Sequence, residues 1–301
     1  MVGVNKYPHD QLLVSAPDDA AYGDYTFGLE PLLLPRPGVE SAPWAHEKCS
    51  YEAWIDAIRT LAEGSESPSE RQPSVNADAV YWFRWITGHQ VCFLIWRLIA
   101  EHPRECDAQS EEHSRILRSY AQAYSAMLLY SGSCSRATYH TVIRPTMKLQ
   151  HPGFSGGWAP DYCLAKDLLT RAAYEDEGLR AALEFKDLVH AYVASRLVPS
   201  GKSLLQESRA PARNTELREV LYDNYFMTIR TDVSRGKIVE QFIRRLLAVA
   251  RDVGGQGLDL FGPSESDAFP ASQPSIIQNF VQQFGNVLAE VALAAVQTAT
   301  S

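Results

Sequence analysis

The segment YWFRWITGHQVCFLIW, residues 81–96, is the stretch on which the interpretation of the whole chain depends. Its large aromatic residues lie four and seven positions to either side of His89, which places them on one face of an α-helix. The pattern predicts a helix over residues 76–101. Such a face is typical either of a core helix with one satisfied histidine or of an aromatic pocket with a polar group, and the spacing leaves both open. The face consists of Trp82, Trp85, His89, Phe93 and Trp96.

The composition limits the classes of protein to which the chain can belong. With 301 residues, 46% of them hydrophobic, the chain is long enough to bury a large core. Its net charge of -8 provides no basic surface for a phosphate backbone, so we expect no nucleic-acid partner. The five cysteines form no CxxC pair, which argues against a zinc knuckle or disulfide framework and favours a reducing compartment. Because no apolar leader or long apolar run is present, we expect a cytoplasmic protein with no membrane partner.

Helical spacing of apolar residues recurs along the chain, and no stretch of useful length alternates as a strand would. We therefore predict an all-α fold, in which a helical bundle over residues 51–301 follows an irregular, proline-rich arm over residues 1–50. Residues 131–161 and 200–215 are predicted loops, the first long enough to be a binding loop or lid. The apolar stripe of the last helix either closes the core or meets a second subunit, which leaves a homodimer open. The predicted helices cover residues 25–34, 51–63, 76–101, 111–130, 162–174, 179–198, 215–229, 234–253 and 275–295.

A second histidine, His190, lies in the middle of the predicted helix over residues 179–198. By itself this is typical of an ordinary core or surface histidine. The presence of His89 and His190 on two apolar helices favours haem over zinc, because a haem iron needs one neutral imidazole in an apolar slot whereas zinc needs three or four clustered ligands. Other motifs are incomplete: SGKS, residues 200–203, lacks the spacing of a phosphate loop, and no GxSxG nucleophile elbow is present.

Three stretches together resemble tryptophan dioxygenase, a haem enzyme with an all-helical fold. WITGHQVCFLIW, residues 85–96, looks like the FIxxHQxxELW stretch of that family, and YGDYTFGLEPLL, residues 22–33, is similar to its N-terminal YxxYLxLDxLL segment. His190, followed six residues later by Arg196, resembles the proximal HxxxVxR segment. The order and rough spacing of the three stretches also agree.

The departures from tryptophan dioxygenase fall on the parts that hold an indole amino acid. The GTGGSSG segment is replaced by PSGKSLLQE, residues 199–207, and the arginine that should follow the GFQS stretch has no counterpart. The chain retains His190 and the HQ pair, His89 and Gln90. In this it looks more like a divergent branch of this superfamily of haem-dependent aromatic oxygenases than like the dioxygenases. That branch contains the L-tyrosine hydroxylases of secondary metabolism, which make L-DOPA with hydrogen peroxide.

The resemblance implies haem b, iron protoporphyrin IX, as the cofactor of a cytoplasmic peroxygenase. It implies His190 as the ligand of the iron, with Arg196 and Trp85 against the cofactor, and His89 on the opposite side as the acid–base residue. The substrates implied are L-tyrosine, hydroxylated at the ring carbon ortho to the phenol, and hydrogen peroxide.

The substrate contacts come partly from the resemblance and partly from the residue types. Trp82 and Trp85 are flat walls suited to a phenol ring. Arg144 is our first candidate for a bidentate clamp on the amino-acid carboxylate, with Arg136 second. Ser203 lies where the family places a polar contact to the substrate amine.

Two alternatives remain open. A haem dioxygenase that cleaves the ring of tryptophan or another indole compound would keep the fold and the cofactor but use dioxygen. A helical binding or assembly protein would contain the same aromatic face merely as core, and it would be colourless.

Overall fold

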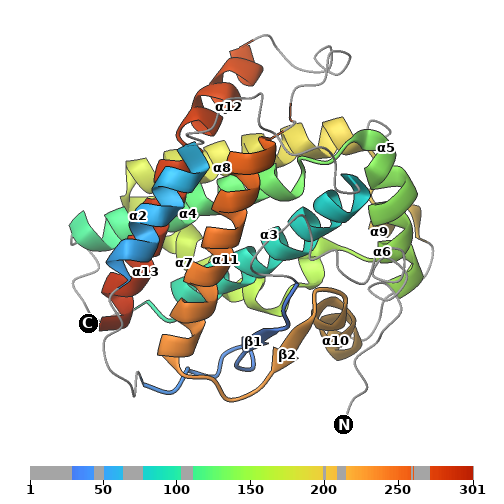
Figure 1. The fold of residues 1–301 in the computed structure, drawn as a ribbon. Coiled ribbons are helices and arrows are strands. Elements are labelled where there is room, and N and C mark those ends of the chain that lie inside the picture. Colours follow the sequence, from blue (N-terminus) through green and yellow to red (C-terminus); the bar gives the residue numbers. More distant parts are fainter. Residues whose placement is uncertain are drawn as a thin grey trace.

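The structure, a computed structural model, consists almost entirely of helices, as predicted (Figure 1). It describes residues 29–43, 51–63, 77–102, 111–198, 201–208, 215–258, 260 and 272–300. The all-α prediction is confirmed, whereas the boundary at residue 50 between arm and bundle stays a prediction. The longer helices are α2 (Glu52–Glu63), α3 (Ala77–Ala100), α4 (Glu111–Ser131), α7 (Pro160–Glu175), α8 (Glu177–Leu197), α10 (Thr215–Tyr225), α11 (Arg235–Gln256), α12 (Ser272–Gln282) and α13 (Phe284–Thr300).

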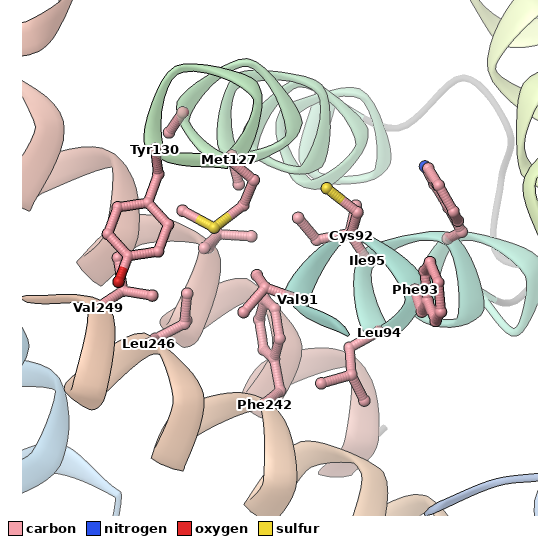
Figure 2. Packing of buried hydrophobic residues seen from close by; sticks show 14 of the residues in the cluster. Val91, Cys92, Phe93, Leu94, Ile95, Met127, Tyr130, Phe242, Leu246 and Val249 are labelled. Carbon is pink, nitrogen blue, oxygen red and sulfur yellow. The ribbon is translucent and has the colours of Figure 1, made fainter. Parts of the chain in front are cut away.

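Helix α3 is the centre of the packing. It contacts α4, α7 and α11, and most of its side chains are buried, as is typical of a helix that is apolar on all sides. Figure 2 shows Val91 of α3 between Met127 of α4 and Phe242 of α11. Helices α2, α11 and α13 lie side by side and close the other side of the core (Figure 1).

One ion pair is buried inside this core. Arg84 of α3 donates from Nε and Nη2 to the two carboxylate oxygens of Asp252 in α11, at 2.7 and 3.0 Å. The Tyr130 hydroxyl donates to the same carboxylate at 2.7 Å, and the arginine also donates to Ser133 Oγ at 3.0 Å. Because both charges are hydrogen-bonded on several sides, the pair holds α3, α4 and α11 in one arrangement without leaving a buried charge unpaired.

Two short parallel strands correct two of the predicted helices. Strand β1 (Leu32–Leu34) pairs with β2 (Thr228–Arg230), with Leu32 opposite Thr228. The helix predicted over residues 25–34 is therefore wrong over residues 29–34, of which the last three form β1, while residues 25–28 lie outside the described residues. The helix predicted over residues 215–229 ends at Tyr225. Tertiary contacts override local propensity here, since the Gln241 side chain hydrogen-bonds to both the N–H and the C=O of Leu33, at 2.9 and 3.0 Å.

The predicted loops contain short helices, so these predictions were wrong. Residues 131–161 form α5 (Arg136–Thr138), the π-helix η3 (Tyr139–Ile143), α6 (Arg144–Gln150) and the 3-10 turn η4 (Gly156–Trp158), and residues 200–215 contain α9 (Leu204–Glu207). Local caps that periodicity does not reveal start two of them: Ser135 accepts from the Thr138 N–H, and Ser203 accepts from the Gln206 N–H.

The last predicted helix is divided between α12 and α13 near residue 283. Helix α13 packs against α2, α4 and α11, so in this structure its apolar stripe closes the core. None of the helices in the described ranges has the length and apolar composition that crossing a bilayer requires.

Two adjacent glycines near the end of α11 test the packing of α2. A Cβ built on Gly254 would lie 1.9 Å from the carbonyl oxygen of Leu61, whereas a Cβ on Gly255 meets nothing within 4 Å. We expect Gly254→Ala to lower the free energy of unfolding by about 1–3 kcal/mol, because α2 and α11 must separate. Gly255→Ala should raise it by up to about 1 kcal/mol through helix propensity. Urea unfolding measures both, and equal effects of the two substitutions would contradict this packing.

Candidate functional site

His89 is the half-buried polar group of the aromatic face of α3. Its ring lies 4.3 Å from that of Trp85 and 4.4 Å from that of Phe226, against which it stacks at an interplanar angle of 15°. Its Nδ1 is 2.6 Å from the carbonyl oxygen of Trp85. Because a carbonyl oxygen only accepts, Nδ1 carries the proton, and in the neutral ring Nε2 keeps a free lone pair.

The surroundings keep this imidazole neutral. Burial lowers the pKa of His89 to about 4, although the hydrogen bond to the Trp85 carbonyl acts in the opposite direction. At pH 7 the ring is therefore uncharged. A neutral imidazole whose Nδ1–H is held by a carbonyl can bind a metal ion or accept a proton at Nε2.

Phe226 reaches His89 from a sharp turn after α10. Met227, the next residue, has a φ of 55°, a left-handed conformation that non-glycine residues seldom adopt. The Gln90 amide donates to the Phe226 carbonyl at 3.0 Å and to the Glu30 carbonyl at 3.0 Å. Gln90, the residue after His89, thus holds the Phe226 ring in its stacked position on His89. Periodicity did not reveal Phe226, and only the adjacency of His89 and Gln90 hinted at a joint role.

The aromatic face continues into the π-helix η3. Tyr139 lies edge-on to Trp85, with 6.1 Å between ring centroids. Burial raises the pKa of Tyr139, and a hydrogen bond with Arg144 opposes that rise. π-Helical turns occur frequently at functional sites. The indole of Trp85 therefore connects His89 to a phenol and a guanidinium in a segment predicted to be a loop.

Arg144 and Ser203, both predicted substrate contacts, lie near one another. The Arg144 Nη2 is 2.8 Å from Glu207 Oε1 and donates to the Lys202 carbonyl at 3.1 Å. Ser203, the residue after Lys202, is exposed, and its hydroxyl accepts from the Gln206 N–H at 3.3 Å as the cap of α9. The structure thus connects His89, Trp85 and Arg144 through Tyr139, with Ser203 on the neighbouring short helix.

Four other candidates lie elsewhere. His190 is exposed on α8, which packs mainly against α4 and α7, so its place opposite His89 stays a prediction. Arg196 is buried and donates to the carbonyls of Gly132 and Cys134, which ties α8 to the end of α4. Trp82 is fully buried behind the face, edge-on to Tyr225, and Arg136 is exposed on α5.

Comparison with known protein families gives a match within the first two thirds of the chain. Residues 36–184 match the model of a family described as SfmD 3-methyl-L-tyrosine peroxygenase. This range contains Trp85, His89 and Arg144, whereas His190 and Phe226 lie beyond it. No curated protein matches the chain.

The lowered pKa of His89 predicts a pH dependence of stability. An exposed histidine titrates near pH 6.5, so between about pH 6.5 and about pH 4 the unfolded chain binds a proton that the folded protein does not. This residue should therefore lower the free energy of unfolding as the pH falls through that range, and add no further loss below it. His89→Gln should weaken the fall, measured by urea unfolding at several pH values, while His140→Gln, at an exposed position of η3, serves as the control. Identical profiles for the native protein and His89→Gln would contradict the assigned environment.

Proposed function

Because residues 36–184 match the model of the 3-methyl-L-tyrosine peroxygenase family, we propose that the protein hydroxylates the aromatic ring of L-tyrosine, or of a ring-substituted L-tyrosine, with hydrogen peroxide. The family is one of enzymes, in the oxidoreductase class. The hydroxyl group would enter at the carbon ortho to the phenol, and L-tyrosine would give L-DOPA. If the ring already carries a methyl group at one ortho carbon, the other ortho carbon is the target. Such products serve natural-product biosynthesis.

The observation that carries this proposal is the neutral His89 among aromatic rings, inside the segment that matches the family. A nitrogen with a free lone pair beside Trp85 can act on a reacting group, while flat rings are suited to grip a phenol. The family match favours a peroxygenase over a ring-cleaving dioxygenase of indoles and over a binding protein without chemistry.

We propose haem b as the cofactor, which would supply the oxidising chemistry with peroxide. The donor set at His89 fits a haem iron, because metal-binding histidines usually donate their other ring N–H to a carbonyl or carboxylate, as Nδ1 does here to Trp85. His190 fits less well, since the residue is exposed on α8, whereas an iron ligand is expected in an apolar slot. Arg196 is occupied with backbone carbonyls.

We therefore favour Nε2 of His89 as the nitrogen that would hold the iron. In the arrangement implied by the resemblance, His190 would do so, and His89 would take the proton of the peroxide. Each arrangement makes His89 essential. They differ in whether His190 is required.

The other residues of the site would orient the substrate. Trp85 offers a partly exposed aromatic surface next to His89, and Tyr139 continues it. Arg144 would hold the amino-acid carboxylate, since a guanidinium can bind a carboxylate through two hydrogen bonds. Trp82 is fully buried, so it would support the aromatic wall without touching the substrate. Ser203 remains a candidate for the substrate amine, provided that its hydroxyl can leave the cap of α9.

A product assay tests the activity. The purified protein is loaded with haem b and incubated with L-tyrosine or 3-methyl-L-tyrosine and hydrogen peroxide. We expect a catechol product that contains one additional oxygen atom, identified by mass spectrometry. The reactions without peroxide, and with L-tryptophan and dioxygen, are the controls. Ring cleavage of L-tryptophan with dioxygen, without turnover of either tyrosine, would contradict the proposal.

A further inference from the structure

The guanidinium of Arg144 already holds a carboxylate of the protein itself. Its Nη2 lies 2.8 Å from Oε1 of Glu207, and the two side chains are 12% and 44% exposed. An amino-acid substrate would bring a carboxylate of the same charge and shape to Arg144. Glu207 and the substrate would therefore compete for one partner.

The ion pair belongs to the same polar group as Tyr139. A hydrogen bond with Arg144 and its positive charge lower the pKa of the Tyr139 hydroxyl, whereas the negative charge of Glu207 raises it. The ring of Tyr139 in turn lies against Trp85. Glu207 thus places its carboxylate at the end of the aromatic wall that starts at His89.

The segment that carries Glu207 is a short helix with an exposed side. Helix α9 has four residues, and its capping box between Ser203 and Gln206 is internal to the helix. Leu204 is buried, whereas Leu205 is 46% exposed. Arg144 of α6 contacts this segment at Glu207 and at the Lys202 carbonyl. Because the Glu207 side chain is 44% exposed and not part of the buried core, its carboxylate can leave Arg144 without unpacking that core.

We propose that Glu207 is an internal carboxylate that occupies the carboxylate site of Arg144 until the substrate displaces it. This inference rests on the proposed function and makes Glu207 a specificity-determining residue. A ligand with a free α-carboxylate breaks the ion pair of Arg144 with Glu207 but forms an equivalent one with Arg144. An amine that lacks the carboxylate cannot form such an ion pair. The pair thereby selects amino acids over the corresponding amines.

Binding measurements on Glu207→Gln test the inference. Isothermal titration calorimetry of the full chain gives the Kd of L-tyrosine and of tyramine, which lacks the carboxylate. Because an ion pair whose carboxylate is exposed to solvent is a weak competitor, we expect Glu207→Gln to bind L-tyrosine about two- to fivefold more tightly than the native protein. The Kd of tyramine should not change. Glu240→Gln is the matched control, since it removes the same charge from a half-exposed pair with Lys237 on α11.

The outcomes separate this inference from the proposed function. If the native protein binds L-tyrosine and Glu207→Gln binds it no more tightly, the competition by Glu207 is refuted while the enzyme proposal stands. An equal gain for tyramine, or in Glu240→Gln, would refute it as well, because the effect would then be one of general charge. If neither protein binds L-tyrosine, the inference and the tyrosine substrate both fall.

Discussion

A buried amide must have partners for its oxygen and its nitrogen, and Gln90 finds them in three distant segments. Its Nε2 donates to the carbonyls of Glu30 and Phe226, and its Oε1 accepts from Arg245 Nε at 2.9 Å. Burial lowers the pKa of Arg245 to about 10, so the arginine stays charged at pH 7. This one side chain therefore sets where the N-terminal segment, the end of α10 and α11 meet α3.

The consequence for the site is that His89 has little freedom. The carbonyl of Trp85, one turn earlier, fixes the proton on Nδ1, and Phe226 covers one face of the ring. Gln90 and His89 are adjacent in α3. The same helical turn therefore supplies the hydrogen bond that fixes Phe226 and the imidazole that Phe226 covers. Preorganisation of this kind holds the imidazole of His89 in one orientation and leaves Nε2 unprotonated.

Helical periodicity predicted much of the fold because most elements bury an apolar face against α3 or α4. It failed where long-range hydrogen bonds decide the backbone, as at Leu33 with Gln241, and where a cap such as Ser135 starts a short helix. The site was predictable only in part. His89, Trp85 and Arg144 follow from residue type and resemblance, whereas Phe226 comes from a segment 137 positions from His89 whose left-handed turn no local pattern reveals. Exposure of His190 likewise depends on how α8 packs, which its apolar residues alone do not determine.

The absorption spectrum of the haem-loaded protein tests the central claim most directly, namely that His89 provides the nitrogen on which the chemistry depends. The native protein, His89→Ala and His190→Ala are each reconstituted with haem b, and their Soret bands are compared with and without L-tyrosine. We predict a Soret band in the native protein that is lost or shifted in His89→Ala and unchanged in His190→Ala. A band that is lost in His190→Ala and unchanged in His89→Ala would contradict this account.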